Sequence, residues 1–267
     1  MKKLLSLFFA LALVLTSCSN DENSSPDDSS SEDNSVLPKT ISYTYPDIFL
    51  GTNSISTNTY NGNKIISSIK NDSKTVFTYD GDKIMKQEQF DIDELGKEIK
   101  SAEVQYTYEN GKLKTRIFKE DISTAYPDGE YIEKIVYVHS SNLISYINYN
   151  VNKNTKEEVK NSEGTLTYKD GNLVKEVQIS GSSTRTRTYE YDAKHNPLKN
   201  ILGFDLLLNE ISEFGKNNVI KTTSILSDFP TPANYISNYI YNDNGYPTKQ
   251  TSLSGGGSVE YEIEYTY

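Results

Sequence analysis

"FTYDGDKIMK" (residues 77–86) and "YTYENGKLKT" (residues 106–115) are two versions of one phrase, 29 residues apart. In each, aromatic residues alternate with a polar residue, which is the period of a β-strand with one buried face. An Asp-Gly or Asn-Gly pair follows, such as Asn110-Gly111. This pair is the strongest short-range hairpin signal, because glycine adopts positive φ without steric cost. The phrase therefore predicts a β-hairpin.

The hairpin phrase recurs about eight times between residues 58 and 249, and a half unit closes the chain. Repetition of one supersecondary unit at a spacing of 19 to 31 residues indicates a fold built from repeats. The aligned aromatic residues are Tyr60, Tyr79, Tyr108, Tyr137, Tyr168, Tyr191, Phe214, Tyr241 and Tyr267.

The repeats predict an all-β domain over residues 36–267, an antiparallel meander of hairpins. Its apolar face must be covered by curling, closing or packing into two layers. A closed barrel of about sixteen strands would leave a lumen that side chains cannot fill. We therefore expect a twisted, rolled sheet, open barrel-like or curled. The acidic row Glu260, Glu262 and Glu264 suits an exposed edge strand at the end of the chain.

One segment, residues 200–212, departs from the strand pattern. Its apolar residues recur at i, i+3, i+4 and i+7, the spacing of a helical stripe. They are Phe204, Leu207, Leu208 and Ile211. We expect a short helix or loop that plugs the rolled sheet; the alternative is an exposed apolar contact for a partner.

The sequence holds 21 tyrosines and no tryptophan. A half-buried tyrosine needs a hydrogen-bond partner for its hydroxyl. Polar residues follow the first apolar residue of most return strands by two positions, and we expect them to serve neighbouring tyrosines. These positions are Ser67, Lys86, Thr115, Ser145, Lys175, Asn200 and Lys221.

The N-terminus, residues 1–17, has the order of a secretory signal, with Lys2 and Lys3 before an apolar run from Leu4 to Leu15. The run is too short to span a bilayer as a mature helix. The sequence Leu15-Thr16-Ser17-Cys18 resembles the lipobox of bacterial lipoproteins, which implies cleavage before Cys18 and lipid on its sulfur. The alternative is an ordinary signal peptide that leaves Cys18 as a free thiol.

Residues 18–35 predict a disordered tether after the lipidated cysteine. The stretch is rich in Ser and Asp and almost devoid of apolar residues, so it cannot offset the entropy of ordering. Asp21 and Glu22 resemble the export signal of surface lipoproteins in Bacteroidota. This resemblance implies an outer-membrane lipoprotein that faces the cell surface.

The motif Tyr-x-Tyr-(Asp/Asn)-x-Asn-Gly-x-(Leu/Ile) resembles the YD repeats of the RHS family over roughly residues 41–267. The resemblance implies hairpins paired side by side in a long curling sheet. The chain is similar overall to YD-repeat-like lipoproteins of Bacteroidota, and that likeness brings no catalytic residues with it.

Candidate chemistry is sparse. His139 and His195 are the only histidines, and both are predicted in turns, where a solvated role is the rule. The sequence contains no Gly-x-Ser-x-Gly motif, and residues 255–258 lack the lysine and helix of a phosphate loop. We expect no cofactor and no catalytic residue.

Carboxylates are the remaining candidates. The row at residues 260–264 and the trio Asp91, Asp93 and Glu94 could each supply paired acids, although a solvated face is the simpler interpretation. Calcium at residues 91–94 or 241–245 is an option, but neither stretch has a full loop signature.

Three interpretations of function remain open. The favoured one is a non-catalytic surface lipoprotein that binds an envelope protein or a polysaccharide. The alternatives are a carboxylate-dependent glycan hydrolase and a purely structural or adhesive component. The formal net charge of −10, without a concentrated basic face, argues against nucleic acid as a partner.

Overall fold

The computed structural model describes residues 35–210 and 215–267. The predicted signal peptide, Cys18, nearly all of the tether, Ile211 and Phe214 lie outside these residues. Among the described residues, no helix has both the length and the apolar character needed to cross a bilayer.

Sixteen strands and one short helix make up the described chain. They are β1 (Thr40–Thr44), β2 (Ser54–Asn61), β3 (Lys64–Lys70), β4 (Ser73–Asp80), β5 (Lys83–Ile92), β6 (Glu98–Glu109), β7 (Lys112–Glu120), β8 (Tyr131–His139), β9 (Leu143–Val151), β10 (Glu158–Lys169), β11 (Asn172–Ser180), β12 (Ser183–Tyr191), the 3₁₀ helix η1 (Phe204–Glu210), β13 (Val219–Leu226), β14 (Phe229–Tyr241), β15 (Pro247–Leu253) and β16 (Val259–Thr266).

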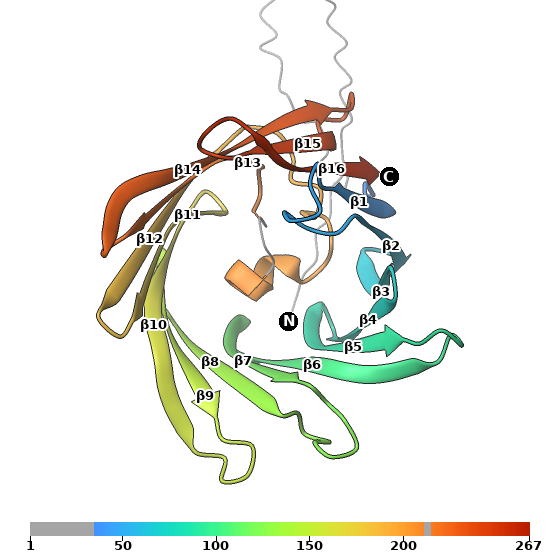
Figure 1. Ribbon diagram of the computed structural model, residues 1–267, viewed down its shortest axis with the longest axis vertical. Coiled ribbons are helices and arrows are strands. Elements are labelled where there is room, and N and C mark those ends of the chain that lie inside the picture. The colour runs from blue at the N-terminus through green and yellow to red at the C-terminus, as the bar shows by residue number, and fades with distance from the viewer. Residues whose placement is uncertain (1–34, 211–214) are drawn as a thin grey trace, which may run out of the picture. The chain divides into compact units, whose positions relative to one another are not determined.

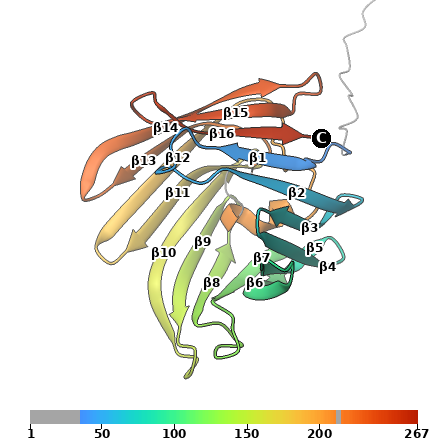
Figure 2. The ribbon, with the colours of Figure 1, turned by 45° about the vertical axis from the view of Figure 1, so that its right-hand side comes forward.

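The strands pair antiparallel in chain order, which confirms the predicted meander of hairpins. The sheet closes into a barrel, because β1 pairs with both β2 and β16 (Figures 1 and 2). The expectation of an open sheet is therefore wrong, and so is the expectation of an acidic edge strand. Glu262 and Glu264 lie on a strand that is paired on both sides, opposite Thr44 and Ser42 of β1.

A register shift at the motif aromatic residue curves the sheet. In β4–β5, Tyr79 lies opposite Ile84 and Thr78 lies opposite Lys86, so Met85 is an extra residue in the return strand. Such a β-bulge bends its strand and increases the local twist, which closure of a barrel requires. The same shift occurs at Tyr60, Tyr108, Tyr168, Tyr191 and Tyr241.

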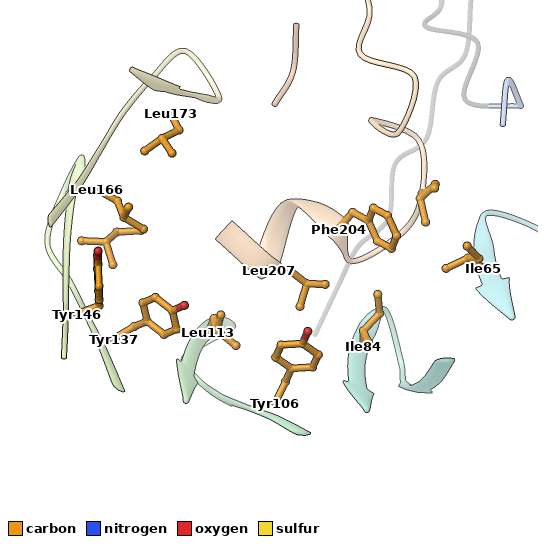
Figure 3. Close-up of a cluster of buried hydrophobic side chains, with 12 residues drawn as sticks. Ile65, Ile84, Tyr106, Leu113, Tyr137, Tyr146, Leu166, Leu173, Phe204 and Leu207 are labelled. Carbon is orange, nitrogen blue, oxygen red and sulfur yellow. The ribbon is translucent and has the colours of Figure 1, made fainter. Parts of the chain in front are cut away.

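Helix η1 lies inside the barrel and packs against one part of its wall (Figure 1). Leu207 is fully buried and Phe204 is nearly so, which confirms the predicted plug. Their side chains extend toward Ile84 and Tyr106 (Figure 3). The buried cluster around them draws its wall residues from β3 and from β5 to β11. The plug therefore fills the interior on the β3–β11 side.

The outer wall is polar. In β6, Val104 and Tyr106 pack in the core, so the alternating residues Glu103, Gln105 and Thr107 face outwards. Cross-strand partners share a face, which extends this assignment to the neighbouring strands. Outward threonines and charged side chains recur around the barrel, and exposed apolar residues such as Ile240 are scattered among them. The outward threonines include Thr57, Thr107, Thr115, Thr165, Thr186, Thr188, Thr223 and Thr251.

Ion pairs cover part of this outer wall. Lys100 Nζ lies 2.7 Å from Glu88 Oε1 and also contacts Glu103, and Lys86 Nζ lies 2.8 Å from Glu88 Oε2. A transmembrane barrel instead presents an apolar band flanked by aromatic girdles to the lipid. The outer wall of this barrel instead mixes ion pairs and threonines with exposed apolar side chains such as Ile69, Val138 and Ile240.

Gly164 lies on the inner wall at a position where there is no room for a side chain, so its replacement tests how tightly this wall is packed. A Cβ at this position would lie 2.2 Å from the carbonyl oxygen of Val177 and 2.6 Å from the hydroxyl of Tyr146. We expect Gly164→Ala to lower the free energy of unfolding by at least about 2 kcal/mol, because the surrounding backbone must move. The matched control is Gly256→Ala, where the nearest atom lies 3.9 Å away. Urea titration of both variants checks the prediction, and equal stabilities would contradict it.

Candidate functional site

The two ends of the barrel differ. The motif end carries the turns of the repeated phrase, for example residues 81–82 and 110–111. The distal end carries the other connections, for example residues 121–130 and 227–228. The plug is fixed at the motif end, since the hydroxyl of Tyr79 donates to the carbonyl of Leu202 at 3.1 Å.

Buried charges hold the end of the plug to the wall. Glu210 of η1 accepts a hydrogen bond of 2.6 Å from the hydroxyl of Tyr137 and pairs with Arg116. The Arg116 guanidinium also donates to Glu133 at 2.7 Å. Burial raises the pKa of the Glu210 carboxyl above its ordinary value, against the opposing effect of Arg116. Burial likewise raises the pKa of Tyr137. One arginine thus forms ion pairs with two interior carboxylates.

A second charged group lies on β11 and β12. Glu176 is buried and accepts from the guanidinium of Arg187 at 3.0 Å and from the hydroxyl of Tyr189 at 3.2 Å. The side chain of Arg187 is 35% exposed, so one side of this ion pair faces open space. The inner wall on this side therefore presents a partly accessible cation.

A cavity of about 560 Å³ lies along the inner wall from β12 to β16, on the side that the plug leaves uncovered. It reaches Leu226 and Phe229 at the distal end and Val219 at the motif end. Its lining combines two arginines, three aromatic rings, several hydroxyls and one carboxylate. The polar and aromatic members are Arg185, Arg187, Thr222, Ser224, Phe229, Thr231, Tyr235, Ser237, Ser252, Glu260 and Tyr261.

This cavity is the candidate functional site. Pockets of this volume, with a few convergent polar groups, are the usual sites for small ligands. Sequence reasoning missed all of its residues except Glu260. A signal was present in "STRTRTYEY" (residues 183–191), where Arg185 and Arg187 share the alternation of the inward Tyr189. Two cations on a predicted inner face mark a polar interior.

One recurring group of tyrosine hydroxyls bonds to backbone carbonyls, mostly of a neighbouring hairpin, while others bond to side chains such as Glu176 and Glu210. The hydroxyl of Tyr108 donates to the carbonyl of Ile84 at 2.7 Å, next to the bulge of the preceding hairpin. His139 takes the same role, with its Nε2 2.6 Å from the carbonyl of Leu113. Matching hydrogen bonds run from Tyr60 to Pro38, Tyr191 to Leu173, Tyr239 to Val219 and Tyr267 to Pro247.

The expected polar side-chain partners are mostly wrong. Only Asn200 serves a tyrosine, donating to the hydroxyl of Tyr246 at 2.8 Å. The other six positions face outwards, in part because the bulge residue displaces the return strand by one position. Thr115, for example, bonds to Thr107 on the outer wall at 2.6 Å. The outward positions are Ser67, Lys86, Thr115, Ser145, Lys175 and Lys221.

The two histidines are structural rather than solvated, which corrects their expected role. His139 ends β8 and bonds to the backbone, as described above. The ring centroid of His195 lies 5.0 Å from that of Tyr246, and its Nδ1 lies 3.2 Å from Lys199 Nζ. Within residues 35–210 and 215–267, no group of three His, Cys, Asp or Glu side chains could hold a metal ion.

The candidate carboxylates are separated by the fold. Glu262 pairs with Lys249 at 2.9 Å on the outer wall, whereas Glu260 lies beside Ser252 at 3.4 Å and lines the cavity. A register shift in β15–β16 separates them. In the 91–94 stretch, Asp93 accepts from the backbone amides of Leu95 and Lys97 at 2.9 Å, so it shapes its own turn.

Tyr108→Phe tests the hydroxyl-to-carbonyl bond. Removal of the hydroxyl leaves the carbonyl of Ile84 without this donor, so we expect a loss of about 1–3 kcal/mol in the free energy of unfolding. Tyr131→Phe is the matched control, because Tyr131 is 61% exposed. Chemical denaturation of both variants measures the difference. Equal losses would show that the bond does not stabilise the barrel.

Glu210→Gln tests the buried carboxyl through pH dependence. Because the pKa of Glu210 is raised in the folded state, its contribution to stability is fully present below the unfolded pKa, about 4.3. That contribution is lost as pH rises through the folded pKa. Glutamine mimics the protonated form, so we expect the variant to gain stability relative to the wild type between pH 4 and pH 7. Urea titrations at both pH values measure the change, and an unchanged difference would contradict the prediction.

Comparisons with known proteins bear on the fold alone. No family model matches the chain, and no curated protein matches it either. A crystal structure of a porin-like protein from Bacteroides vulgatus is 15% identical, with a TM-score of 0.60, and the match covers 87% of this chain and 98% of that one. A second porin-like protein, from Bacteroides uniformis, is 10% identical with a TM-score of 0.48, covering 86% and 97%. The chain has the fold of a porin-like barrel.

Proposed function

We propose that this protein is a non-catalytic, lipid-anchored barrel at the outer membrane that binds an extracellular ligand, a polysaccharide or an envelope protein, in its interior. The observation that carries the proposal is the cavity of about 560 Å³ lined by aromatic rings, hydroxyls and arginines. Such a lining can stack on a ligand and also donate hydrogen bonds to it.

The polar outer wall supports attachment through lipid rather than through insertion of the barrel. Threonines and ion pairs such as Lys100–Glu88 occupy positions that a lipid-facing wall would fill with apolar residues. Lipid on Cys18, with a tether that carries Asp21 and Glu22, would hold the barrel near the membrane while its wall stays in water. The origin of the structural neighbours in Bacteroides agrees with this placement.

Two other functions are less well supported. A pore is suggested by the printed names of the neighbours, but the plug occupies part of the interior and the outer wall does not suit a bilayer. A glycan hydrolase would need two free carboxylates across a groove. The interior carboxylates Glu133 and Glu210 are not free in this sense, because each forms an ion pair with Arg116.

The proposal is tested on intact cells that express the wild-type protein or the Cys18→Ala variant. We expect a palmitate analogue to label the wild type and not the variant. A membrane-impermeant cross-linker should join the wild type to a surface glycan or to one dominant envelope protein, identified by mass spectrometry.

The labelling experiment and the cross-linking experiment test the lipid anchor and the ligand separately. Equal labelling of both proteins would disprove the anchor on Cys18. Absence of any cross-linked glycan or protein would disprove ligand binding. Conductance across planar bilayers after addition of the purified protein would favour the pore instead.

A further inference from the structure

The cavity contains one arginine, Arg185, that has no ionic partner among the described residues, and this residue bears on the charge of the ligand. Within residues 35–210 and 215–267, Arg185 forms no ion pair, although it is one of only three arginines in the chain. Arg187, two residues along the same face, is already paired with Glu176. A guanidinium has five donors in a planar fork that fits a carboxylate or sulfate in a bidentate manner.

Aromatic rings extend from the same cavity towards β1. Phe229 is 72% exposed and Tyr235 is 41% exposed, although both line the interior of the barrel. Tyr261 continues this surface, with its ring centroid 6.2 Å from that of Tyr43 and 5.9 Å from that of Tyr45. Accessible rings in a concave site can pack against the apolar face of a sugar ring.

Hydroxyls complete the lining. Thr222, Ser224 and Ser237 face the cavity from β13 and β14, and each can both donate and accept a hydrogen bond. Glu260 lies on the β16 side beside Ser252, where its carboxylate can accept from a ligand hydroxyl. The cavity thus offers donors, acceptors and rings on the neighbouring strands β12 to β16, with its unpaired cation on β12.

We propose that the cavity binds an acidic saccharide, with Arg185 holding the carboxylate or sulfate group and Tyr235 packing against a sugar ring. This inference rests on the proposed function, because it names the ligand class of the same site. A neutral saccharide would leave Arg185 without an anionic partner. A protein ligand is the other outcome that the test distinguishes.

The test is calorimetric titration of the purified full-length protein in detergent with tri-galacturonic acid, with its methyl ester, and with a sulfated and a desulfated heparin disaccharide. We expect at least one acidic member to bind at least tenfold more tightly than its neutral counterpart. Arg185→Gln should weaken that binding by about ten- to a hundredfold, because a charge-assisted contact is lost. The affinity should also fall as NaCl rises from 50 to 500 mM.

Two further variants fix the location of the site. Tyr235→Ala should weaken binding of the acidic saccharide about tenfold through loss of the stacking surface. Lys175→Gln is the matched control, since Lys175 lies on the outer wall opposite Thr188 and its loss removes one charge without touching the cavity. Circular dichroism spectra and melting curves of all three variants should match those of the wild type.

The outcomes separate the two proposals. Equal binding of acidic and neutral members, weakened by Tyr235→Ala but not by Arg185→Gln, would overturn the acidic ligand and keep the binding function. Loss of affinity in Lys175→Gln equal to that in Arg185→Gln would indicate non-specific charge attraction and overturn the site. No binding of any saccharide would overturn the inference, while the cross-linking experiment would still decide whether a protein is the ligand.

Discussion

The barrel depends on the bulge at the motif tyrosine and on the hydrogen bond that accompanies it. The extra residue in the return strand bends the sheet, and the hydroxyl of a tyrosine in the next hairpin reaches a carbonyl beside the bulge, as Tyr108 does at Ile84. The β-bulge and the hydrogen bond to the carbonyl beside it therefore occur together in several hairpins. The device is absent from the β8–β9 hairpin, which pairs without a register shift. Elsewhere it curves one hairpin relative to the last and bonds the two together, and closure between β1 and β16 follows from the sum of these bends.

The same device explains the arrangement of polar residues. Tyrosines fill much of the inner face, and most of their hydroxyls bond to backbone carbonyls or to acidic and amide side chains. The buried hydroxyl of Tyr168 is an exception and has no hydrogen-bond partner among the described residues. The outer positions are then free to carry threonine, lysine and glutamate. The likeness to porin-like structures is thus one of strand arrangement. The outer wall combines ion pairs and threonines with exposed apolar side chains, and its charged part is what supports the proposed attachment through lipid.

Sixteen strands enclose more space than their own side chains can fill, and the chain solves this problem on one side only. Helix η1 shares one buried cluster with residues of β3 and of β5 to β11; within it, Leu207 is fully buried and Glu210 pairs with Arg116. On the side from β12 to β16 the described residues line a cavity of about 560 Å³. Asymmetric filling is therefore what creates the candidate site, and it places the site beside the strands that carry Arg185 and Tyr235.

The sequence by itself determined the elements and their order. Period-two alternation and Asn-Gly turns predicted the hairpins, and the helical spacing of Phe204 and Leu207 predicted the plug, because these signals depend on near neighbours in the chain. Closure was decided only by the tertiary structure, since the summed effect of six bulges cannot be read from any one of them. The binding cavity was decided there as well. Arg185 becomes part of a site only when residues of β12 and β16 line the same cavity. This arrangement depends on the register of every strand between them.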